Sequence, residues 1–183
     1  MNANVPPEVP LDTELQQALA AHQAGQYAEA EALYLAILQA QPYHAIANHN
    51  LGLLAGQLGQ PAAGLPYLHK ALSVNPDEGQ FWLSYANGLL QAERPDEALE
   101  IVETAIGRGL DNAASQALRQ QARDAIALAA LSPTQEEAAP IVALYQSGEF
   151  ARMEDASRTL LLQYPQAPWV WSVLGTALQA QGK

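Results

Sequence analysis

The sequence predicts an all-α fold, built as a solenoid of helix–turn–helix units. Gly25 and Gly59 are 34 residues apart, as are Pro42 and Pro76, and each glycine precedes its proline by 17 residues. Apolar residues between these positions recur at i, i+3, i+4 and i+7, which is the spacing of an amphipathic helix. A fixed period of this length is typical of repeat architectures, so we expect stacked units that each contact their neighbours.

Three pairs of helices are expected before residue 111. The first helices cover 12–24, 45–58 and 79–92, and the second helices cover 27–40, 61–74 and 95–107. Ala30, Tyr34 and Ile37 fall on one face of the first of the second helices. Gly25 suits a helix end that needs positive φ, and Pro61 suits the first turn of a helix, where no amide hydrogen is needed.

Small residues stand where the two helices of a pair should cross. Gly52 on the first helix and Gly64 on the second are followed one period later by Ala86 and Ala98. A residue without a large side chain lets two helix backbones approach closely. The sequence therefore predicts close helix crossings at these positions and assigns the glycines no ligand.

The period breaks after residue 110 and then returns. Gly148 again precedes Pro165 by 17 residues, but Trp82 and Trp171 are 89 residues apart, which is 21 more than two periods. Something of about 21 residues interrupts the array.

Residues 112–131 fit the interruption as one long Ala-rich helix, with Asp111 or Asn112 as N-cap. Thr134 and Glu137 have the spacing of a capping box for the next helix. The expected organisation is a flexible lead-in (1–10), three repeats (11–110), a bridging or capping helix (111–133), and one repeat with a terminal first helix (134–183). Alternatively, the long helix is a linker that lets the two blocks move independently.

The segments "GQYAEAEALYLAILQAQP", "NLGLLAGQLGQ" and "WLSYANGLL" carry a family resemblance. A 34-residue helix–turn–helix unit with these residues resembles the tetratricopeptide repeat (TPR). The resemblance implies a right-handed superhelix of about 4.5 repeats, interrupted by the long helix. It also implies that the first helices line a concave groove, in which members of the family bind proteins or peptides.

Composition narrows the classes of partner. The chain has 183 residues, a formal net charge of −11 and no cysteine, which excludes disulfides and Cys-ligated zinc. Nucleic-acid binding and attachment to anionic membranes both need the opposite charge. No segment approaches the roughly 20 apolar residues of a membrane span, and the N-terminal segment does not resemble a signal peptide. We expect a cytoplasmic protein that binds neither nucleic acid nor membrane.

The groove positions that the resemblance implies are apolar or amide-bearing, with hardly any charge. The candidate residues are Leu15, Gln16, Leu19, His49, Asn50, Leu53, Leu83, Ser84, Asn87, Leu90 and Trp169. Leucines here suit the apolar anchors of a partner helix, and the amides suit an extended backbone. The alternative is that the leucines pack against neighbouring first helices or against the N-terminal segment of the chain.

One ligand class of the family does not fit these positions. Chaperone-binding members clamp a terminal carboxylate with Lys, Asn and Arg, but Leu15 and Leu19 occupy two of those positions here. Gln80 and Ser84 replace two later basic residues, and only Asn50 matches. We therefore expect an apolar or amphipathic protein segment, and no terminal-carboxylate ligand.

No catalytic or metal-binding pattern emerges. His44 and His49 are five residues apart, which does not place two ligands on one helix face. The carboxylates between 93 and 103 lie at a helix start and along its outer face, where a solvated surface explains them. "GLLAGQLG" lacks the Lys-Ser or Lys-Thr of a phosphate loop. We expect no enzyme activity, no cofactor and no bound metal.

The sequence thus favours a non-catalytic scaffold or adaptor. As an alternative, "YPQAPWVWSVLG" is similar to helical modules attached to bacterial glycosyltransferase-like, sulfotransferase-like and oxygenase enzymes. The chain would then be a substrate-recruiting module whose catalytic domain is absent here. A third possibility is self-association through an open C-terminal edge.

Overall fold

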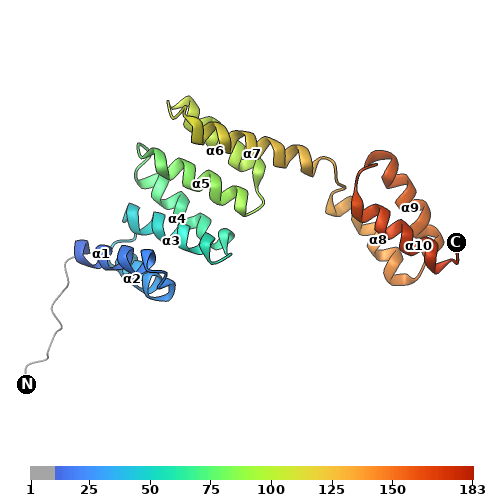
Figure 1. Cartoon of the computed structure of the whole chain (residues 1–183), viewed down its shortest axis with the longest axis horizontal. Helices are drawn as coiled ribbons and strands as arrows, with labels where there is room; N and C mark the ends of the chain where they lie inside the picture. Colours follow the sequence, from blue (N-terminus) through green and yellow to red (C-terminus); the bar gives the residue numbers. More distant parts are fainter. Residues whose placement is uncertain (1–10) are drawn as a thin grey trace, which may run out of the picture. The chain divides into compact units, whose positions relative to one another are not determined.

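A computed structural model describes residues 11–183, over which the chain forms ten helices and no strand (Figure 1). They are α1 (Leu11–Gln23), α2 (Tyr27–Ala40), α3 (Ala45–Gln57), α4 (Pro61–Val74), α5 (Gly79–Gln91), α6 (Pro95–Gly107), α7 (Ala113–Ala129), α8 (Gln135–Ser147), α9 (Phe150–Gln163) and α10 (Pro168–Ala180). The predicted all-α fold is confirmed. The lead-in predicted for 1–10 lies outside the described residues.

The chain divides into two compact units, and the boundary falls inside α7. Unit 1 extends to Arg123, and unit 2 runs from Asp124 to Lys183. Within unit 1, each helix from α1 to α5 packs against the one that follows it, and α3 also contacts α5 (Figure 1). Within unit 2, α9 packs against both α8 and α10. We call α1, α3, α5, α8 and α10 the first helices, and α2, α4, α6 and α9 the second helices.

Each unit has its own apolar core. In unit 1, Tyr34, Ile37 and Leu89 are fully buried, and in unit 2, Met153 and Val170 are fully buried. Burying a side chain of this size stabilises a fold by roughly 1.5–3 kcal/mol. The stacked helices are therefore held together by layers of apolar contacts.

The predicted close crossing is present between α3 and α4. A Cβ atom added to Gly64 would lie 2.5 Å from the carbonyl oxygen of Gly52, and one added to Gly52 would lie 2.5 Å from Cγ of Leu68. The two glycines are therefore required by backbone contact between the helices.

The turn after a first helix has positive φ in four repeats. Gly25, Gly59 and Gly148 have φ between 72° and 75°, as expected for glycine. The corresponding residue after α5 is Glu93, with φ of 58°. The fold thus imposes the same turn on a residue that disfavours it.

A side-chain bond near the start of the first helix recurs in three repeats. Each donor bonds the carbonyl oxygen of the proline six residues earlier: Asn48 Nδ2 to Pro42 at 3.1 Å, Trp82 Nε1 to Pro76 at 2.8 Å, and Trp171 Nε1 to Pro165 at 2.9 Å. Trp171 makes this bond at the surface, since it is 55% exposed.

The N-terminal half of α7 packs within unit 1. Asn112 caps it by accepting from the backbone amides of Ala114 and Ser115 at 2.9 and 3.1 Å. Ala122 is fully buried in one cluster with Leu89 and others, so this half of α7 covers apolar surface of α5 and α6.

Candidate binding surfaces on the first helices

Two adjoining cavities follow the first helices of unit 1. One, of about 290 Å³, is lined by Leu19, His22, Gln23, Tyr27, Asn50 and Gln57. The other, of about 210 Å³, is lined by Gly52, Leu53, Gly56, Gln57, Pro61, Leu68, Ser84, Asn87, Gly88 and Gln91. Gln57 borders both. We call this surface the unit 1 strip; it includes five of the predicted groove residues.

His22 is held in a fixed orientation at the first cavity. Its Nε2 lies 2.8 Å from Oε1 of Gln57, and its Nδ1 lies 3.2 Å from the hydroxyl of Tyr34. Burial raises the pKa of Tyr34 to about 12, so this hydroxyl stays protonated. Asn50 donates its amide to the Ile46 carbonyl at 2.9 Å, which leaves its amide oxygen facing no protein donor among the described contacts.

Glycine keeps space open in the second cavity. A Cβ added to Gly56 would lie 2.9 Å from Oε1 of Gln91. Without that Cβ, the amide of Gln91 reaches over α3, next to the half-buried Leu53 and Asn87. Amide groups and one apolar side chain thus converge on a small concave surface.

His49 and Ser84, both predicted in the groove, bond to each other between α3 and α5. Nε2 of His49 lies 2.8 Å from Oγ of Ser84, and both side chains are buried. Because Gln80 donates its amide to the same Oγ, the hydroxyl hydrogen is free to point at His49, whose Nε2 then accepts. Burial lowers the pKa of His49, and the nearby Glu78 charge partly opposes this. Neutral His49 thus joins two repeats, and it is buried between them instead of lining an open groove.

The remaining predicted residues of unit 1 differ in exposure. Leu15 packs against the core cluster around Tyr34, and Leu90 packs against the cluster around Leu89. Leu83 is half-buried and Gln16 is exposed.

Charge is distributed unevenly between the two kinds of helix. None of the five first helices contains Lys or Arg, whereas second helices, α7 and turns hold all eight cationic side chains. The first-helix surfaces therefore provide no fixed positive charge for an anionic ligand.

Unit 2 has an apolar cavity of about 280 Å³ between α8, α9 and α10. It is lined by Ile141, Val142, Tyr145, Met153, Trp169, Val173 and Thr176. Trp169, predicted as an anchor site, is half-buried in this wall, while Val142 and Tyr145 are 49% and 56% exposed. No lining side chain is charged. We call this cavity the unit 2 pocket.

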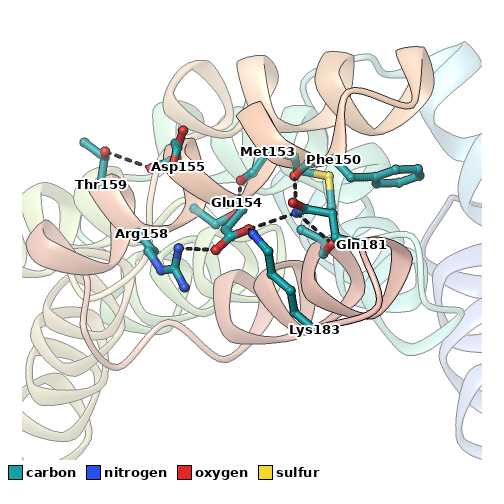
Figure 2. A network of polar contacts seen from close by, with 10 residues as sticks. Phe150, Met153, Glu154, Asp155, Arg158, Thr159, Gln181 and Lys183 are labelled. Carbon is teal, nitrogen blue, oxygen red and sulfur yellow. Dashed lines mark hydrogen bonds and ion pairs between the residues drawn. The ribbon is translucent and has the colours of Figure 1, made fainter.

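A buried carboxylate holds the end of unit 2 in place (Figure 2). Glu154 on α9 is only 4% exposed and accepts bonds from Lys183 Nζ at 2.7 Å, Gln181 Nε2 at 2.9 Å and Arg158. The hydrogen bond from Lys183 lowers the pKa of Glu154 most, although burial opposes it. Gln181 also donates to the carbonyl of Phe150 at 3.1 Å, so α9 and the residues after α10 are joined twice.

The described residues contain neither a group of metal ligands nor a helix that could span a membrane. Over residues 11–183, no three His, Asp or Glu side chains are grouped as ligands for a metal ion. None of the helices there combines the length and apolar character that crossing a bilayer requires.

Comparison with known proteins identifies the repeats. The sequence model of the tetratricopeptide repeat family matches residues 55–122. A comparison with curated protein sequences gave no match.

Solved structures with a similar fold are TPR domains. The first TPR domain of Spaghetti (RPAP3), bound to the HSP90 peptide SRMEEVD, superposes with a TM-score of 0.59 at 16% identity, covering 64% of this chain and 93% of that one. The Sgt2 TPR domain from Aspergillus fumigatus gives 0.59 at 21% identity, covering 68% and 82%. The TPR2B domain of yeast Sti1, in complex with pHsp70, gives 0.57 at 14% identity, covering 62% and 96%. Residues 55–122 thus match the tetratricopeptide repeat family, and the described helices as a whole have the all-α fold of the TPR domains.

Proposed function

We propose that the chain is a non-catalytic scaffold or adaptor that binds a segment of a partner protein along the unit 1 strip. The observation that carries this proposal is the pair of adjoining cavities, which combine leucines at 19 and 53 with the amides of Asn50, Gln57 and Asn87. Side-chain amides are suited to bond a peptide backbone, and leucines are suited to bury apolar anchors. Peptide complexes of similarly folded TPR domains support the same kind of ligand.

The ligand proposed here differs from the HSP90 peptide SRMEEVD that is bound to the first TPR domain of Spaghetti (RPAP3). That peptide has three acidic side chains. Binding a carboxylate inside a groove requires a cation or several donors to replace its hydration. Helices α1, α3 and α5 contain no Lys or Arg, and the whole chain is acidic. The partner segment is therefore apolar or amphipathic, and its terminal carboxylate contributes nothing.

Peptides selected on the wild-type chain from a random display library provide the test. Calorimetry then compares wild type with Leu19→Asp and Leu53→Asp, and each variant is expected to weaken binding by about tenfold or more, since a charge replaces apolar contact in one of the two cavities. Leu35→Asp is the matched control, because Leu35 is exposed on the second helix α2.

Two results would contradict the proposal. If the Leu19 and Leu53 variants bind as wild type does while remaining folded by circular dichroism, the strip is not the site. If amidating the peptide C-terminus weakens binding about tenfold, a carboxylate is recognised after all.

A further inference from the structure

We propose that the unit 2 pocket is a second, separate binding site, which takes one large apolar side chain from a partner segment with neutral or basic flanks. Its shape supports this. The cavity of about 280 Å³ is open and bounded by two aromatic side chains, Tyr145 and Trp169. Its floor is Met153, which is fully buried and belongs to a residue type that adapts to irregular ligands.

The lining favours an aromatic anchor. Ile141, Val142 and Val173 provide apolar contact, and Thr176 adds a hydroxyl. A phenyl ring between Tyr145 and Trp169 gains edge or offset contacts in addition to apolar burial. A charged group there would lose hydration without gaining a partner.

The charges of unit 2 determine which residues can stand on either side of the apolar anchor in the partner segment. Its three cations all face carboxylates: Arg152 bonds Glu149 at 2.6 Å, while Lys183 and Arg158 bond Glu154. No cation of unit 2 thus remains for an acidic partner, whereas Glu136 is exposed in the first turn of α8. With net charges of −3 for residues 124–183 and −11 for the chain, basic flanks are attracted and acidic flanks repelled.

The chain's own tryptophans can report whether the unit 2 pocket is occupied. It has three, so a proton–nitrogen correlation spectrum of the ¹⁵N-labelled full chain contains three indole signals. Trp169 lines the pocket, whereas the indoles of Trp82 and Trp171 bond proline carbonyls elsewhere. A ligand in the pocket therefore shifts the Trp169 signal selectively.

The probes are three unlabelled, acetylated and amidated nine-residue peptides with Ser and Gly elsewhere. One has a central Phe between two Lys on each side, the second replaces Phe by Ala, and the third replaces every Lys by Glu. The Phe–Lys peptide is expected to shift Trp169 saturably, in the millimolar range that one buried side chain supports. The Ala peptide is expected to bind at least about tenfold more weakly. The Glu peptide should also bind more weakly, and added salt should narrow that difference.

Variants locate the site. Val142→Lys places a cation at the half-exposed rim and is expected to weaken binding of the Phe–Lys peptide at least about tenfold, through lost apolar contact and repulsion of the basic flanks. Leu162→Lys is the matched control, since Leu162 is 86% exposed on α9 and does not line the pocket. Unchanged Trp82 and Trp171 signals verify the fold. Leu53→Asp should leave the shift of the Trp169 signal unchanged. The proposals for the unit 2 pocket and for the unit 1 strip can therefore be contradicted separately.

Four results would overturn the proposal. The first is no saturable Trp169 shift with any peptide. The second is equal binding of the Phe and Ala peptides or of the Lys and Glu peptides. The third is a Trp169 shift with protein concentration alone, which would make a second copy the occupant. The fourth is tenfold tighter binding after deletion of residues 1–10, which would make the chain's own N-terminus the occupant.

Discussion

At the scale of single residues, Glu93 is held in an unfavourable backbone conformation. Its φ of 58° is one that glycine adopts freely in the equivalent turns. A side chain there costs roughly 1–2 kcal/mol, so Glu93→Gly is expected to raise the free energy of unfolding by about 1 kcal/mol. Urea denaturation measures the change. The reciprocal Gly59→Glu should lower stability by a similar amount, and an unchanged or less stable Glu93→Gly variant would show that the turn carries no strain.

His49 makes stability depend on pH. Its pKa is lowered in the folded chain, so between that value and the ordinary 6.5 the unfolded state binds more protons. The contribution of neutral His49 to the free energy of unfolding is fully present above pH 6.5 and is lost as the pH falls toward the pKa of the folded state. Urea unfolding at pH 7.5 and 5.5 should show a larger loss for wild type than for His49→Gln, whose amide does not titrate. Equal losses in both proteins would remove His49 as the cause.

At the scale of helices, two glycines in helix interiors, one in α4 and one in α10, are expected to respond oppositely to alanine. A Cβ at Gly64 meets the Gly52 carbonyl, whereas a Cβ at Gly175 in α10 meets nothing within 4 Å. Gly64→Ala should lower the free energy of unfolding by about 1–3 kcal/mol, because α3 and α4 are forced apart. Gly175→Ala should raise it by roughly 0.5–1 kcal/mol through helix propensity. Thermal unfolding of the pair tests both, and the same sign for both variants would contradict the packing argument.

The helices could be predicted from sequence because their ends are marked by local chemistry. Glycine at Gly25 and Gly59 and proline at Pro61 act within one turn, so each predicted boundary in unit 1 lies within one residue of the observed helix. The positive φ of Glu93 could not be predicted, because it is imposed by repeat packing and not by the residue itself.

The site was harder to predict, because it depends on how neighbouring helices cross. His49 and Ser84 face each other only because α3 and α5 are adjacent, which no local pattern encodes. Trp171 occupies the same repeat position as Trp82, yet Trp82 is only half-exposed and lies 5.4 Å from the guanidinium of Arg108. Periodicity gave both the same expected role, and only their surroundings distinguish them.

At the scale of the whole molecule, stability in a repeat protein is a sum over units and their nearest neighbours. A change in unit 2 should therefore act on α9 and α10 and leave α1 to α4 unaffected. Glu154 allows a strict test, since it is buried and bonds Lys183 and Gln181 from the far end of the unit.

Glu154→Gln keeps the shape of the side chain but removes the charge that Lys183 and Arg158 face. Native-state hydrogen exchange is expected to accelerate in α9 and α10, with exchange in α2 and α3 unchanged. Because the pKa of Glu154 is lowered from its ordinary value of 4.5, its contribution is present above that value and is lost as the pH falls through the folded pKa. In acid, the exchange rates of α9 and α10 in wild type should therefore approach those in the Glu154→Gln variant. Faster exchange throughout α1 to α4 would show instead that the two units unfold as one cooperative body.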